Sequence, residues 1–131
     1  MQQIKRTIII AEDDKSFGEL TEIILREALD TKYDYSRIDL GSNLDKILSS
    51  GAGNIALAVI DDDMKLGLKG SEIIKKYARK VKFPFILNYA PGDVEETIGK
   101  QALEDGAVAY FNKSPGTLKL LAEKAKEILE G

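Results

Sequence analysis

The sequence contains no cysteine and no histidine. Without cysteine there is no disulfide framework, no thiolate metal site and no thiol nucleophile. Without histidine, the commonest ligand for metals and the commonest general base are both absent. Any chemistry must therefore use carboxylates, lysine, tyrosine, serine or threonine, and a bound metal would be a hard cation held through oxygen.

Excess positive charge and long apolar runs are also missing. The net charge is −3 at pH 7, which argues against direct nucleic-acid binding because such surfaces are usually basic. The apolar run before Glu12 is too short for a signal peptide, and no run is long enough for a membrane span. We therefore expect a single cytoplasmic domain over residues 1–131, which is enough chain for one hydrophobic core.

Apolar runs alternate with helix-like stretches along the chain. The runs predicted as strands are Thr7–Ala11, Tyr35–Leu40, Ile55–Ile60, Pro84–Tyr89 and Ala107–Phe111. Strands that alternate with helices form a parallel sheet covered on both faces, which is an α/β fold. The usual arrangement for this number of strands is a doubly wound five-stranded parallel sheet in the order 2-1-3-4-5.

Polar residues stand where four of these strands end. They are Glu12 and Asp13, then Asp61, Asp62 and Asp63, then Asn88 and Tyr89, and finally Lys113. In the order 2-1-3-4-5 these four strands are neighbours about 4.8 Å apart, so the groups can meet in one cleft at the carboxyl edge of the sheet. Carboxylates from two adjacent strands suit Mg²⁺, and a nearby lysine can pair with an anion at that metal.

Each acidic cluster also has a simpler explanation, because a helix N-terminus favours negative charge. Helix capping explains Asp14 well, but it explains Glu12 and Asp13 poorly. It does not explain three consecutive aspartates that are separated from Gly70 by a loop. Lys113 alone would be a solvated surface lysine. The functional interpretation therefore rests on the convergence of all four strand ends.

With this pattern the sequence resembles the receiver domain of two-component response regulators, over nearly the whole chain. The acidic pair after the first strand, the aspartates before Gly70 and the Lys after the last strand all have counterparts in that family, as do Gly106 and Ala107. The resemblance implies a flavodoxin-like (αβ)5 sandwich. It also implies phosphorelay signalling, in which a partner histidine kinase or histidine phosphotransfer protein donates a phosphoryl group.

The resemblance assigns a role to each residue of the site. The family's phosphoacceptor stands eight residues before a glycine, and counting back from Gly70 gives Asp62. Mg²⁺, or Mn²⁺ in its place, would be held by the residues Glu12, Asp13 and Asp62 and by the carbonyl of Met64. Lys113 and Tyr89 would contact the phosphoryl group, and Tyr89 with Tyr110 would form the conformational switch. Strand alternation then turns Asp61 and Asp63 to the face opposite Asp62.

Two departures from the family pattern keep other functions open. Tyr89 replaces a small hydroxyl residue, and Ser114 replaces the proline that usually follows the lysine. Both favour a pseudo-receiver, an interaction module that signals without phosphorylation. A metal-dependent phosphohydrolase is a further alternative, because Asp61 and Asp63 form a DxD pair, although that family places DxD on its first strand. In the receiver interpretation the chain is a monomer or weak homodimer that docks to a downstream output protein and contacts neither DNA nor a membrane.

Overall fold

The sheet and helices follow the alternation expected from the sequence. The computed structural model describes residues 5–50, 53–90 and 95–130. The strands pair in parallel in the order β2-β1-β3-β4-β5, which confirms the predicted doubly wound topology. The elements are β1 (Arg6–Ala11), α1 (Lys15–Leu29), β2 (Tyr33–Ile38), α2 (Gly41–Ser49), β3 (Ile55–Asp61), α3 (Gly70–Tyr77), β4 (Phe85–Tyr89), α4 (Glu95–Glu104), β5 (Ala109–Asn112) and α5 (Pro115–Glu130).

The central strands are buried on both faces, whereas β2 lies at the edge of the sheet. Four consecutive residues of β1 and six of β3 are buried, so their continuous apolar sequences match their positions. The β2 strand is more polar because only one of its edges pairs with a neighbour. It spans Tyr33–Ile38 rather than the expected Tyr35–Leu40, in register with β1 from Arg6 to Ala11.

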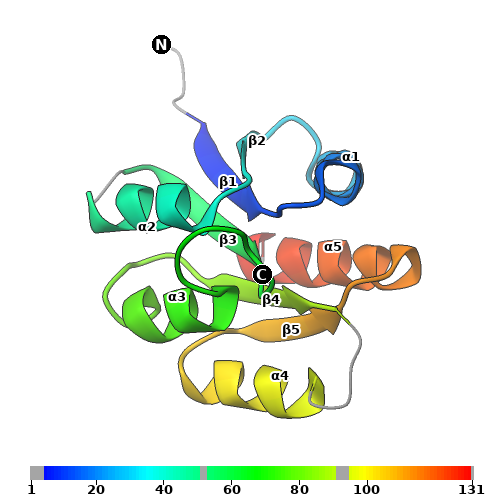
Figure 1. Cartoon of the computed structure of the whole chain (residues 1–131). Helices are drawn as coiled ribbons and strands as arrows, with labels where there is room; N and C mark the ends of the chain where they lie inside the picture. Colours follow the sequence, from blue (N-terminus) through cyan, green and yellow to red (C-terminus); the bar gives the residue numbers. More distant parts are fainter. Residues whose placement is uncertain (1–4, 51–52, 91–94, 131) are drawn as a thin grey trace.

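The helices cover the sheet in two layers (Figure 1). The helices α1 and α5 pack on one face, where they bury alternate residues of the strands such as Ile10 and Val59. The helices α2, α3 and α4 pack on the other face, over residues such as Ile60 and Leu87. Among the residues described, no helix combines the length and the apolar character needed to cross a bilayer.

Main-chain hydrogen bonds hold the strand ends together at the carboxyl edge. The N–H of Glu12 donates to the Ile38 carbonyl at 2.9 Å, and the N–H of Asp62 donates to the Asn88 carbonyl at 2.7 Å. The N–H of Lys113 donates to the carbonyl of Tyr89 at 2.8 Å. These bonds tie the residue that follows β1 to the end of β2, and the residues that follow β3 and β5 to the end of β4, so the strand ends form one edge before any side-chain contact is considered.

Candidate functional site

Three carboxylates meet beyond the ends of β1 and β3. Glu12, Asp13 and Asp61 each place one carboxylate oxygen within 4.8 Å of the other two. Glu12 is 7% exposed and Asp61 only 1% exposed. Burying carboxylates so close together is costly unless a cation compensates for their charge. The cluster therefore requires a positive partner.

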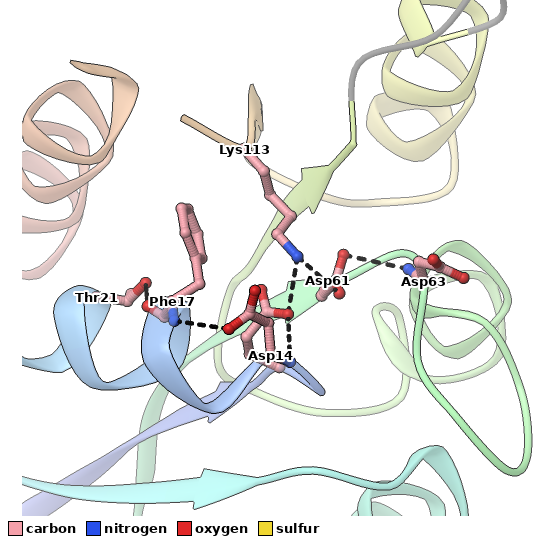
Figure 2. Close-up of polar contacts among 7 residues, drawn as sticks. Asp14, Phe17, Thr21, Asp61, Asp63 and Lys113 are labelled. Carbon is pink, nitrogen blue, oxygen red and sulfur yellow. Dashed lines mark hydrogen bonds and ion pairs between the residues drawn. The ribbon is translucent and has the colours of Figure 1, made fainter. Parts of the chain in front are cut away.

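Lys113, which follows β5, supplies that positive partner (Figure 2). Its Nζ lies 2.8 Å from Oε2 of Glu12 and 3.3 Å from Oδ2 of Asp61. Only 17% of its side chain is exposed. The lysine is thus a partly buried ion-pair partner, and the expectation that it converges with the acidic residues of β1 and β3 is confirmed.

The pKa values of these groups are shifted because the charges are buried together. Burial raises the pKa of Glu12 to about 8, although the hydrogen bond from Lys113 opposes this shift. Burial also raises the pKa of Asp61. Burial also acts to raise the pKa of Asp13. Hydrogen bonds with Glu12 and Asp61 outweigh burial there, so the pKa of Asp13 is lowered. Burial acts to lower the pKa of Lys113, but the hydrogen bond to Glu12 and the charge of Asp61 outweigh it and raise the pKa. Glu12 therefore holds a proton to a higher pH than an ordinary glutamate.

The structure places Asp61, and not Asp62, among these groups. Residues of β3 alternate between the two faces, with Val59 on the α1/α5 face and Ile60 on the other. Asp61 consequently shares the face of Val59 and points to Lys113. The expected orientation, with Asp62 turned towards the cleft and Asp61 away from it, is therefore wrong.

Asp62 instead supports the first turn of α3. Its Oδ1 accepts a hydrogen bond from the Ser71 N–H at 2.9 Å, and its carbonyl accepts one from the Gly70 N–H at 3.1 Å. A Cβ at Gly70 would overlap the carbonyl oxygen of Asp61. Gly70 is needed because the backbone of α3 packs closely against the end of β3. The number of residues between the aspartates and Gly70 therefore does not show whether Asp61 or Asp62 faces the cleft.

The two tyrosines predicted as a switch lie on the α2/α3/α4 face. Tyr89 is 5% exposed and belongs to the core cluster on that face. Its ring centroid lies 5.9 Å from that of Tyr110, with the planes tilted by 35°. Tyr110 in turn packs against α4, where a Cβ at Gly99 would overlap its ring. The ring of Tyr89 therefore fills core space that a small hydroxyl residue would leave open.

The remaining acidic neighbours and Met64 have separate positions. The side chain of Met64 is buried in the core on the α2/α3/α4 face. Asp63 is exposed, and its N–H donates to Oδ1 of Asp61 at 3.2 Å. Asp14 caps α1 by accepting a hydrogen bond from the Phe17 N–H, as the capping argument expected.

The donor set of the cluster fits a hard divalent cation. Glu12, Asp13 and Asp61 supply only carboxylate oxygens, which are the ligands that Mg²⁺ and Mn²⁺ prefer. The upward pKa shifts of Glu12 and Asp61 show that the fold disfavours their negative charge without such a cation. This chemistry fits the predicted Mg²⁺, with Asp61 in the ligand position expected for Asp62.

Sequence reasoning did not assign a site role to Phe17. It lies in the first turn of α1, and Lys113 Nζ stands over its ring at 5.1 Å from the centroid. In the sequence this residue is indistinguishable from any apolar residue on the inner face of a helix. The proximity of Phe17 to the site follows from the short connection between β1 and α1.

Comparison with known proteins identifies the fold by structure alone. No protein-family model and no curated protein matches the sequence. The signal receiver domain of a DNA-binding response regulator from Colwellia psychrerythraea 34H has a TM-score of 0.79 and 18% identity, covering 97% of this chain and 100% of its own. The phosphorylated cyanobacterial phytochrome response regulator RcpA has a TM-score of 0.78 and 14% identity, covering 98% and 96%. The Mn²⁺-bound form of response regulator Rcp1 has a TM-score of 0.73 and 15% identity, covering 95% of both chains. The chain has the fold of response regulator receiver domains.

Proposed function

We propose that residues 1–131 form a receiver domain that accepts a phosphoryl group on Asp61. The observation that carries this proposal is the position of Asp61, whose Oδ2 lies 3.3 Å from Lys113 Nζ within the carboxylate cluster of Glu12 and Asp13. An anionic oxygen next to a cation-binding cluster and a lysine is suited to phosphoryl transfer, which depends mainly on positioning and on compensation of charge. The acceptor role expected for Asp62 passes to its neighbour.

In the proposed reaction an Asp61 oxygen attacks the phosphorus of a phosphohistidine on a partner kinase or phosphotransfer protein. The new P–O bond forms as the P–N bond breaks, and the electron pair of that bond leaves with the imidazole nitrogen, which is then protonated from solvent. Glu12, Asp13 and Asp61 would hold Mg²⁺, which supplies charge compensation on the phosphoryl oxygens. Lys113 would donate a hydrogen bond to one of them. The donor must be external because this chain contains no histidine.

Two structural relatives support this proposal. RcpA is described as phosphorylated, and Rcp1 as Mn²⁺-bound. Both chemistries are those expected at the cluster of Glu12, Asp13 and Asp61. By the same analogy the domain would act in the cytoplasm between a histidine kinase and an output protein.

The proposal is tested by phosphorylation with acetyl phosphate and Mg²⁺, followed by intact-mass measurement. We expect the wild-type chain and Asp62→Asn to gain the mass of one phosphoryl group, and Asp61→Asn to gain none. The two variants are matched because each replaces one aspartate by its amide at adjacent positions. Phosphorylation of Asp61→Asn, with loss in Asp62→Asn, would return the acceptor role to Asp62.

The buried position of Tyr89 favours a second candidate, a pseudo-receiver that binds partners without being phosphorylated. Its ring is 5% exposed and packs against Tyr110, so moving either ring requires repacking of the core. An unchanged mass of the wild-type chain, with folding and Mg²⁺ binding intact, would support this candidate. The phosphohydrolase alternative loses support because Asp63, the second residue of its DxD pair, is exposed, and the carboxylate of Asp61 is directed to Lys113.

A further inference from the structure

Lys113 is contacted on a third side by an uncharged group. Its Nζ lies over the ring of Phe17, 5.1 Å from the ring centroid. Figure 2 shows this ring standing beside the lysine side chain, on the side away from Asp61. An ammonium within about 6 Å of an aromatic face is attracted by the negative face of the ring. Phe17 thus adds an attraction for the lysine that does not come from an ion.

The position of Phe17 is fixed by the same carboxylate that binds the lysine. Oε2 of Glu12 accepts hydrogen bonds from both Lys113 Nζ, at 2.8 Å, and the Asp14 N–H, at 3.1 Å. Asp14 then accepts from the Phe17 N–H at 3.1 Å, and the Phe17 carbonyl accepts from the Thr21 hydroxyl at 2.8 Å. These hydrogen bonds fix the first turn of α1, and with it the Phe17 backbone, relative to Glu12 and Lys113.

The ring contact differs from the two ion pairs because it does not use an N–H donor of the lysine. A lysine ammonium has three N–H donors, and here it makes hydrogen bonds to Glu12 and Asp61. The attraction to the ring needs no lone pair, so an N–H remains for a further acceptor. The ring is also neutral, so its attraction does not weaken when a proton or another cation occupies the carboxylates.

We propose that Phe17 is a positioning residue for Lys113 in the phosphoryl transfer described above. It holds the ammonium beside the carboxylates of Glu12 and Asp61, with a donor available to a phosphoryl oxygen. This inference rests on the proposed function for its consequence in catalysis, but the contact itself exists in the unphosphorylated protein.

The first test is NMR of the unphosphorylated protein. The Cε protons of Lys113, identified by their absence in Lys113→Arg, are expected to show an upfield ring-current shift. Phe17→Leu, which keeps an apolar side chain without a ring, should remove the shift. Phe17→Tyr should retain it, and Phe17→Trp should increase it. Phe83→Leu is the matched control, because it removes a ring that pairs with Phe85 and is not among the groups that contact Lys113.

The second test is the rate constant for phosphorylation by acetyl phosphate at saturating Mg²⁺. Phe17→Leu should lower it by about twofold to fivefold, the range expected for loss of a cation–π contact at a partly exposed site. Phe17→Tyr should restore the wild-type rate constant, and Phe83→Leu should leave it unchanged. The apparent affinity for Mg²⁺ should be the same in all variants, because the carboxylates remain.

The outcomes separate this inference from the proposed function. An unchanged Lys113 shift in Phe17→Leu, or a Phe17→Tyr variant as slow as Phe17→Leu, would overturn the role of Phe17. If Phe17→Leu is poorly folded, Phe17→Trp decides, because an unaltered Lys113 shift in that variant also contradicts the contact. Failure of the wild-type chain to accept a phosphoryl group would overturn the proposed function, while the shifts would still report the Phe17 contact.

Discussion

The two faces of the sheet use its carboxyl edge differently. On the α1/α5 face, Asp61 meets Lys113 and Glu12, and charged groups are buried together. On the α2/α3/α4 face, the adjacent Asp62 accepts a hydrogen bond from the first turn of α3, and two tyrosine rings fill the core beside α4. A step of one residue along β3 therefore changes the environment of an aspartate from a charged cluster to a helix terminus. The charged cluster and the paired tyrosine rings therefore lie on opposite faces of the sheet.

The single substitution with the largest expected effect is at Gly70, where α3 packs on the end of β3 through the backbone. Gly70→Ala should lower the free energy of unfolding by about 3 kcal/mol, because the new Cβ would overlap the Asp61 carbonyl and force α3 away from β3. Urea denaturation measures this change. Gly53→Ala is the control, since a Cβ there meets no atom within 4 Å. Equal stability of the two variants would contradict the close packing of α3 on β3.

A second prediction concerns the tyrosine side of the comparison. Gly99→Ala should destabilise the protein by about 2 kcal/mol, because its Cβ would overlap the Tyr110 ring. Helix propensity alone favours the opposite sign, by about 1 kcal/mol in favour of Ala. In a Tyr110→Ala background the same substitution should therefore stabilise by about 1 kcal/mol. A double-mutant cycle from urea denaturation checks the change of sign, and additive effects would show that the ring does not contact Gly99.

The third prediction concerns the pH dependence on the charged face. Because the pKa of Glu12 rises from 4.5 unfolded to about 8 folded, the folded state binds more protons between these values. The metal-free protein should therefore lose stability as the pH rises from 4.5 towards 8, by at most about 1.4 kcal/mol per pH unit from this group. Denaturation across this range should give a flatter profile for Glu12→Gln and an unaltered one for the exposed control Glu104→Gln. An increase in stability with pH that Glu12→Gln abolishes would contradict the raised pKa.

The smallest expected effect compares the two adjacent aspartates directly. Asp62→Ala should cost about 1 kcal/mol, because the Ser71 N–H loses its acceptor, whereas Asp62→Asn keeps an acceptor and should cost less. Asp61→Asn should instead stabilise the metal-free protein at neutral pH, because the fold disfavours the charge of that buried carboxyl and raises its pKa. Thermal denaturation of the three variants shows whether substitution lowers the stability at Asp62 and raises it at Asp61.

Most of the fold could be predicted because burial on both faces leaves long apolar runs in β1 and β3. The strand order then brought Glu12, Asp13 and Lys113 together without any knowledge of side-chain directions. The edge strand β2 was displaced by two residues in the prediction. Its polar sequence carries little periodic signal, and its register is set by pairing with β1.

The same burial explains why the choice between Asp61 and Asp62 failed. Val59 and Ile60 are both apolar because each faces a packed layer of helices. A strand that is apolar on both faces has no polar alternation to show which residue faces which layer. The sequence offered only the number of residues before Gly70. That glycine is required by the close approach of the α3 backbone to the end of β3, and not by the direction of either aspartate.

Gly99 illustrates the same limit on the other face. From the sequence it could be interpreted only as a residue that weakens its helix. Its contact with Tyr110 depends on how α4 lies against β5, which local propensity does not encode. Phe17 is similar, because its contact with the lysine that follows β5 depends on how that strand lies relative to the first turn of α1.

The sequence by itself determined the order of the elements, the single edge at which polar groups gather and the oxygen character of any metal site. Those properties follow from composition and from hydrophobic periodicity, which act locally along the chain. Only the tertiary structure decided that Asp61 faces Lys113, that Asp62 supports α3 and that Phe17 contacts the lysine. These depend on which face of a doubly buried strand each side chain takes, and that choice is made by the packing of both helical layers together.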